Sequence, residues 1–156
     1  MSESVTVSRV LPDEAATLQI GQEWSAALSA PLTVYLQGDL GAGKTTLVRG
    51  VLRGLGYTGS VKSPTYSIVE SYPLPALTLH HFDLYRFSYP EEWEDAGLDE
   101  LFADNSVCLI EWPQQGGEFV PPPDMTVALA HTDSGRICTF TAHTENGRKN
   151  LEAWLN

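Results

Sequence analysis

A chain of 156 residues, 42% of them hydrophobic, is long enough to bury a core, and we expect one domain over residues 1–156. No apolar run approaches the roughly 18 residues of a membrane span, and the amino terminus lacks a signal-like stretch, which predicts a cytoplasmic protein with no membrane partner. The formal net charge of -11 argues against a surface that grips nucleic acid by itself, because that affinity comes mainly from clustered Lys and Arg. Cys108 and Cys138 lie in apolar or β-rich stretches, which favours buried thiols over a metal or redox pair.

The charge is unevenly distributed along the chain. Residues 40–69 contain four basic side chains and no acid, so nucleotide phosphates would meet a favourable local field there. Residues 91–104 show the opposite pattern, with seven acids and no base. This acidic stretch is either a solvated helical face or a docking surface for a basic partner.

The first predicted elements form a strand, a glycine loop and a helix, preceded by another helix. That first helix is expected over Asp13–Ser29, after Pro12, because apolar residues recur at helical spacing until the chain reaches Pro31. A β-branched apolar run at Leu32–Leu36 then predicts a strand that enters the glycine loop directly. Helical spacing returns over Thr45–Leu55.

The rest of the chain predicts mostly strands. Because these strands lack long helical crossovers between them, part of the sheet is expected to be antiparallel. The predicted fold class is therefore α/β, a layered fold with a mixed parallel and antiparallel central sheet. The expected elements are strands at Tyr66–Tyr72, Leu77–Asp83, Val107–Glu111, Met125–Ala130 and Arg136–Ala142, helical turns near Pro90–Phe102, a loop at Pro113–Pro123 and a closing helix near Gly147–Leu155.

The glycine loop, GDLGAGKT at residues 38–45, matches the pattern G-x-x-x-x-G-K-[ST], so the layered α/β fold is predicted to be a P-loop NTPase fold. Its glycines let backbone N–H groups turn toward phosphate oxygens at the start of a helix. We predict that Lys44 neutralises the β and γ phosphates, that the Thr45 hydroxyl ligates Mg²⁺, and that Thr46 helps to hold the α phosphate. No Asn-Lys pair that could begin a guanine-reading motif occurs in the chain, which favours ATP.

Two carboxylates that end predicted strands are candidates for the metal site and for hydrolysis. Glu111 ends a continuous apolar run, typical of a strand buried on both faces, and is the first candidate for the metal shell. Asp83 ends a more mixed run and is the second, as a water-orienting or outer metal partner. His80 and His81 receive no chemical role, because no second His or Cys stands at zinc spacing.

Two further segments allow more than one interpretation. Ser63-Pro64-Thr65 is either a loop that senses the γ phosphate through the Thr65 hydroxyl or an ordinary turn. Arg86 either stabilises charge at the site or pairs with a nearby acid.

Four segments together resemble the bacterial TsaE family in order and spacing: GDLGAGKTT at 38–46, VKSPTY at 61–66, HFDLYR at 81–86 and IEWP at 110–113. PDE at 12–14 extends the resemblance over nearly the whole chain. The resemblance implies an ATPase for threonylcarbamoyl modification of the adenosine next to the anticodon in tRNA. Such proteins bind the TsaB/TsaD pair, in which TsaD transfers the group, and ATP hydrolysis resets the complex, so tRNA is met only through the complex.

The resemblance also assigns residues by position. Lys44, Asp83 and Glu111 would be the catalytic set, with Thr45 and Glu111 as the Mg²⁺ ligands. Thr65 and Trp112 would shape the site near the γ phosphate. The nucleotide would further contact Glu14, Arg136 and the phosphate cradle, which consists of Gly41, Ala42, Gly43, Lys44, Thr45 and Thr46.

Two other function classes begin with the same strand, loop and helix. A small-molecule kinase would need a substrate pocket and usually a lid with arginines, and the Pro113–Pro123 loop carries no base. A GTP-dependent switch would normally carry the guanine-reading run that this chain lacks. Both are therefore less favoured than an ATPase.

Overall fold

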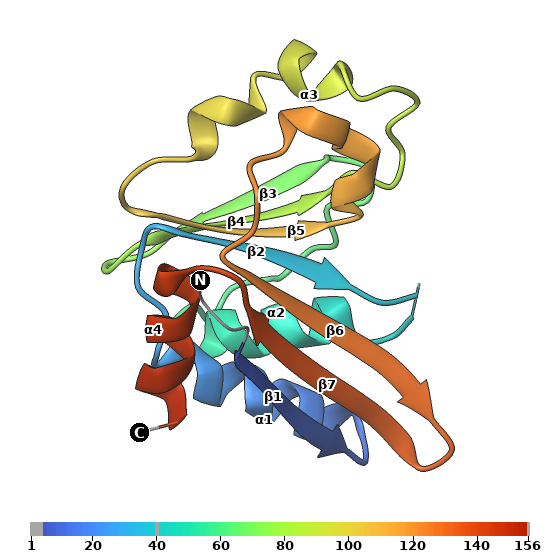
Figure 1. Ribbon diagram of the computed structural model, residues 1–156, viewed down its shortest axis with the longest axis vertical. Helices are drawn as coiled ribbons and strands as arrows, with labels where there is room; N and C mark the ends of the chain where they lie inside the picture. Colours follow the sequence, from blue (N-terminus) through green and yellow to red (C-terminus); the bar gives the residue numbers. More distant parts are fainter. Residues whose placement is uncertain (1–4, 40, 156) are drawn as a thin grey trace.

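The computed structural model describes residues 5–39 and 41–155, so the first four residues, Leu40 of the glycine loop and Asn156 lie outside the described part. Within that part a seven-stranded sheet has the spatial order β1-β7-β6-β2-β5-β4-β3 (Figure 1). The strands are β1 (Val5–Leu11), β2 (Leu32–Gln37), β3 (Val69–Pro73), β4 (Thr78–Asp83), β5 (Ser106–Glu111), β6 (Met125–Thr132) and β7 (Gly135–Ala142).

The sheet is mixed, as the sequence predicts. Strand β2 pairs in parallel with β5 and β6, and β4 pairs in parallel with β5. Strands β1, β7 and β3 pair with their neighbours in the antiparallel sense. Because β2, β4 and β5 run in the same direction, their carboxyl ends meet at one edge of the sheet, where open α/β sheets collect ligands.

Helices α1 (Glu14–Ser25), α2 (Lys44–Gly54) and α4 (Glu145–Leu155) bury their apolar sides in one core with the sheet (Figure 1). Asp13 caps α1, since its carboxylate accepts a hydrogen bond of 2.9 Å from the backbone N–H of Ala16. Trp24 of α1 is fully buried and donates from Nε1 to Oδ1 of Asn150 in α4 at 2.9 Å. This bond ties the first helix of the chain to the last.

Helices α1 and α2 approach each other closely at two glycines. A Cβ at Gly21 would lie 2.5 Å from the carbonyl oxygen of Leu47, and a Cβ at Gly50 would collide with the carbonyl oxygen of Leu18. The two backbones are therefore in direct contact, and this contact sets the position of α2 and of the loop that precedes it.

Short helices cover part of the other face of the sheet, at the top of Figure 1: α3 (Glu92–Asp95), η1 (Leu98–Leu101) and η2 (Pro113–Phe119). They enclose an aromatic cluster in which the rings of Phe82, Trp93 and Phe102 lie 5.6 to 5.7 Å apart. Trp93 is fully buried, whereas six of the seven acids in residues 91–104 are exposed. The acidic stretch is thus an amphipathic cover whose carboxylates face solvent.

The structure differs from the predicted elements in four places. Strand β1 was not predicted; it is an edge strand whose seven residues show no buried stripe except Leu11. The third strand begins at Val69 and not at Tyr66, because residues 65–67 form a turn and Ile68 has a φ of 74°. Helix α1 ends at Ser25, four residues early, and the predicted loop after Pro113 folds into η2.

Within residues 5–39 and 41–155, no helix combines the length and the apolar character needed to cross a membrane.

Candidate functional site

The glycine loop joins the carboxyl end of β2 to the amino end of α2. Its three glycines have φ angles of 142° at Gly38, 80° at Gly41 and 105° at Gly43, a region that L side chains rarely adopt. A Cβ at Gly43 would lie 2.8 Å from a guanidinium nitrogen of Arg136. The first turn of α2 carries no acid, so its backbone N–H groups face an anion site without competition from a carboxylate of that turn.

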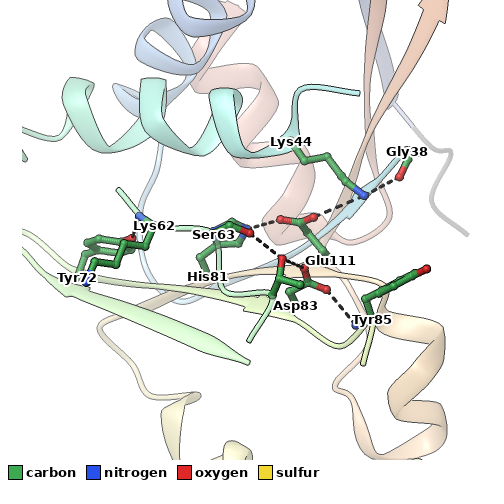
Figure 2. A network of polar contacts seen from close by, with 10 residues as sticks. Gly38, Lys44, Lys62, Ser63, Tyr72, His81, Asp83, Tyr85 and Glu111 are labelled. Atoms are coloured by element: carbon green, nitrogen blue, oxygen red, sulfur yellow. Dashed lines mark hydrogen bonds and ion pairs between the residues drawn. The ribbon is translucent and has the colours of Figure 1, made fainter. Parts of the chain in front are cut away.

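Lys44 is buried, with 5% of its surface exposed, and reaches back across the loop (Figure 2). Its Nζ donates to the carbonyl oxygen of Gly38 at 2.6 Å and lies 3.5 Å from Oε1 of Glu111. The ammonium group also lies 4.9 Å from the centre of the Trp112 ring, within cation–π range. Incoming phosphates can take over these contacts, because an ammonium pairs with any nearby anion as a point charge.

Glu111 stands at the end of β5, opposite Asp83 of β4 in the parallel register. Oε2 of Glu111 lies 2.5 Å from Nε2 of His81, and Oε1 faces Lys44. Burial alone would raise the pKa of Glu111, but the hydrogen bond from His81 and the charge of Lys44 outweigh it and hold that pKa below its ordinary value. Glu111 is therefore ionised at neutral pH, as a metal ligand must be.

Asp83 is buried and belongs to a small network of hydroxyl and amide groups. Its Oδ2 accepts a hydrogen bond of 3.3 Å from the Thr65 hydroxyl, which in turn lies 2.8 Å from the Ser63 hydroxyl. The backbone N–H of Tyr85 donates to Oδ1 at 2.9 Å. The loop that carries Ser63 and Thr65 is thus anchored to the strand-end carboxylate (Figure 2).

One cavity of about 350 Å³ brings most of the predicted residues together. That volume falls in the range of small-molecule sites, roughly 300–1,000 Å³. It is lined by Glu14, Gly41, Gly43, Lys44, Thr45, Thr46, Ser63, Thr65, Asp83, Glu111 and Arg136.

Two predicted residues lie apart from this cavity. Trp112 lies on the far side of Lys44 and lines a neighbouring cavity of about 310 Å³ with Gly38 and Pro113. It has a φ of 56° and a buried Nε1 with no hydrogen-bond partner among the described residues. The Ala42 side chain points into the hydrophobic core and is 1% exposed, so only its backbone can belong to a phosphate cradle.

Glu14 and Arg136 approach the cavity from opposite ends of the chain. The Thr46 hydroxyl donates to Oε1 of Glu14 at 3.3 Å, and Nη1 of Arg136 donates to the Thr17 hydroxyl at 3.1 Å. The guanidinium group of Arg136 also lies against Gly43. A nucleotide seated on the glycine loop would therefore meet side chains from α1 and β7 as well as from α2.

The residues present fit a nucleotide-bound magnesium ion better than a metal centre made by protein alone. The described residues contain no group of three or more His, Cys, Asp or Glu that could hold a metal. Magnesium usually takes one or two carboxylates, a hydroxyl, waters and phosphate oxygens. Glu111, Asp83 and Thr45, which line the same cavity, supply that kind of donor set.

Two side chains behave differently from the sequence-based expectations. His81, to which no role was given, is fully buried against Glu111. Arg86 does not line the cavity and forms no ion pair with an acid among the described residues, but stacks over the exposed ring of Tyr66 at 4.1 Å. Strand alternation could have indicated His81, because residues 81 and 83 share one face of β4 and Glu111 pairs with Asp83.

Comparison with known proteins identifies the family. The model of the family described as "Threonylcarbamoyl adenosine biosynthesis protein TsaE" matches residues 11–138 of the chain. The chain belongs to the TsaE family. The resemblance seen in the sequence is thereby confirmed, and the family works in the biosynthesis of threonylcarbamoyladenosine in tRNA.

Relatives of the TsaE family match the chain over most of its length. The tRNA threonylcarbamoyladenosine biosynthesis protein TsaE of Haemophilus influenzae is 40% identical over 156 residues, 97% of this chain and 99% of that protein. TsaE of Bacillus subtilis is 43% identical over 120 residues, 76% of this chain and 75% of that protein. The crystal structure of Bacillus subtilis YdiB has a TM-score of 0.80 at 31% identity and covers 99% of this chain and 96% of that one, which confirms the P-loop NTPase fold.

Proposed function

We propose that this TsaE family member is an ATPase that serves threonylcarbamoyl modification of tRNA. One observation carries the proposal: Lys44, Thr45, Asp83 and Glu111, from a glycine loop and two strand ends, line the same cavity. A phosphate-binding loop facing two carboxylates is the constellation that hydrolysis of a nucleoside triphosphate requires.

The proposed role of each cavity residue follows from its position. The N–H groups at the start of α2 and the Lys44 ammonium hold the phosphates, and the Lys44–Glu111 contact opens as phosphate replaces the carboxylate. The Thr45 hydroxyl and Glu111 would hold Mg²⁺, which when bound neutralises charge on the β and γ phosphates. Asp83, tied to Thr65, would orient the attacking water. The rest of the nucleotide would contact Thr46, Glu14 and Arg136. The ring of Trp112 would contact the Lys44 ammonium group.

The chemistry of the chain outside the cavity supports work on a partner protein. The Pro113–Phe119 segment, which could have served as a lid, is folded as η2 and carries no base. Because the chain belongs to the TsaE family, we assign the hydrolysis to the cycle of the TsaB/TsaD pair, in the cytoplasm, with tRNA reached only through the complex. Residues 1–156 would act as one domain.

Reconstitution of tRNA modification with TsaB and TsaD tests this function. We expect multiple turnovers of modification only when the chain and ATP are both present, and slow ATP hydrolysis by the isolated chain that the partners accelerate. Lys44→Ala should lower ATP affinity by at least about tenfold, because it removes the charge that faces the phosphates. Unchanged ATP binding by this variant would refute the site, and strong phosphorylation of a metabolite by the isolated chain would refute the function.

A further inference from the structure

Among the described residues, His81 is a buried titratable side chain beside the cavity to which the proposed function gives no role. It is 0% exposed, on the same face of β4 as Asp83, and its Nε2 lies 2.5 Å from Oε2 of Glu111. Its other ring nitrogen, Nδ1, has no hydrogen-bond partner among the described residues. The contact with Glu111 is therefore the only polar contact that the described structure gives this ring.

The contact fixes which atoms donate and accept. A carboxylate that is to bind a cation only accepts hydrogen bonds, so Nε2–H of His81 is the donor in the 2.5 Å contact with Oε2 of Glu111. With Oε2 held by His81, the other oxygen, Oε1, is directed to Lys44. The Glu111 carboxylate is thus held at Oε2 by the His81 ring and at Oε1 by the Lys44 ammonium group.

The two contacts of Glu111, with Lys44 and with His81, would respond differently to a bound nucleotide. Lys44 faces the phosphates and would exchange its carboxylate contact for them, whereas His81 is enclosed and stays in place. Once Lys44 has left, His81 is the group that keeps Oε1 directed to the place where a cation and phosphate would meet. A neighbour that orients a metal-binding carboxylate typically contributes roughly 10–100-fold to metal affinity or activity.

We propose that His81 is a positioning residue for magnesium: through Nε2–H it holds Glu111 so that Oε1 is ready to bind the cation that accompanies the nucleotide. The inference rests on the proposed function. Because the inference gives His81 no contact with the phosphates, loss of His81 should weaken metal binding and leave metal-free nucleotide binding nearly unchanged.

The two amide side chains provide matched variants, because each mimics one ring nitrogen. His81→Gln can place an N–H near the position of Nε2 and so retain the donor to Glu111, whereas His81→Asn can place one only near Nδ1. His80→Gln is the control for a histidine change in β4, since His80 lies on the opposite face and pairs with the Ser71 hydroxyl at 2.7 Å.

The measurement is the affinity for ATP by calorimetry in EDTA and across a Mg²⁺ titration, with thermal unfolding to show that each variant is folded. We expect His81→Asn to require about tenfold more Mg²⁺ for half of the metal-dependent gain in affinity. Its affinity in EDTA should change less than about threefold, because the phosphate contacts remain. His81→Gln and His80→Gln should stay close to wild type.

Equal Mg²⁺ requirements in the Asn and Gln variants, whether both normal or both raised, would overturn the role of His81, and so would an equal loss of affinity with and without metal. If the wild-type protein itself bound ATP with no dependence on Mg²⁺, the metal site of the proposed function would fall, and this inference with it. Failure of the His81 inference alone leaves the wild-type dependence on Mg²⁺ intact.

Discussion

Glu111 and Asp83 face each other at the ends of β5 and β4, yet their surroundings differ. Glu111 contacts two nitrogen groups, Lys44 and His81, whereas Asp83 contacts a hydroxyl and a backbone N–H. Two carboxylates in different environments can take different roles at one site. We assign the metal to Glu111 and the water to Asp83 on this basis.

The assignment predicts a separation of effects between two isosteric variants. Glu111→Gln should remove most of the gain in ATP affinity that Mg²⁺ gives, whereas Asp83→Asn should keep that gain and lower kcat by roughly 10²–10⁴-fold. Calorimetry with and without Mg²⁺, combined with steady-state hydrolysis in the presence of TsaB and TsaD, measures both quantities. The opposite pattern, with metal dependence lost only in Asp83→Asn, would exchange the two roles.

The two cysteines give a prediction about pH. Burial raises the pKa of Cys108 and of Cys138 to about 12, from the ordinary thiol value of 9.0. The folded state keeps both thiols protonated while the unfolded chain ionises near pH 9, so their contribution to stability is complete below pH 9 and is lost as the pH rises toward 12.

We therefore expect neither thiol of the native protein to react with a disulfide reagent at pH 8, and both to react after unfolding in guanidinium chloride. Absorbance of the released thiolate measures the number of reacted groups. Rapid reaction of one equivalent with the native protein would contradict the burial of that cysteine.

Sequence predicts residues of the site well where a local pattern dictates the chemistry, and less well where strand pairing does. Lys44 and Thr45 follow from the glycine loop, because the loop itself positions them. His81 does not, since its partner Glu111 lies 30 residues away and becomes a neighbour only through the parallel register of β4 with β5. Zinc-ligand spacing does not detect such a histidine, because a residue that orients a carboxylate needs no second His or Cys nearby.

At the scale of elements, the contact between α1 and α2 controls the position of the glycine loop. Gly50 has no room for a Cβ, because one would collide with the carbonyl oxygen of Leu18 in α1. The added methyl group must push the helices apart, and such overpacking typically costs 1–3 kcal/mol.

Gly50→Ala should accordingly lower the free energy of unfolding by about 1–3 kcal/mol and also weaken ATP binding, because α2 carries Lys44 and Thr45. Arg53→Ala, an exposed change in the same helix, is the control and should stay within about 0.5 kcal/mol of wild type. Urea denaturation measures both variants. A Gly50→Ala protein as stable as the control would show that the helices adjust without cost.

Elements with strong periodicity were predicted, and elements determined by their neighbours were not. Strand β2 and helix α2 carry their own apolar patterns, and both appear close to the predicted bounds. Strand β1 exists because β7 offers it a paired edge, and most of its side chains remain exposed or half-exposed. Nothing in its local pattern distinguishes such a strand from an extended terminal segment.

For the whole molecule, the distribution of charge governs which partners it can approach. The net charge is -11, and of the four bases in residues 40–69 Lys44 lines the cavity beside the glycine loop. A surface with this net charge repels a polyanion at long range, whereas binding to a phosphate backbone depends on an excess of clustered cations.

The isolated chain should therefore show no saturable binding to tRNA up to about 10 µM protein at roughly 0.15 M salt. Fluorescence anisotropy of labelled tRNA, with TsaB and TsaD added in a parallel titration, measures this. Submicromolar binding of tRNA by the chain alone would contradict the proposal that tRNA is reached only through the complex.

The pairing of β2 determines when the site can form during synthesis of the chain. Its neighbour β6 begins at Met125, and Arg136 of β7, which touches Gly43 of the glycine loop, comes later still. While a ribosome is still synthesising the middle of the chain, the strand that supports the loop has an unpaired edge and the cavity lacks a wall. Domains emerge amino end first at roughly 5–20 residues per second, so a nascent chain carries the complete phosphate motif for several seconds before it can form the finished site. We therefore expect the chain to bind ATP only when its synthesis is nearly complete.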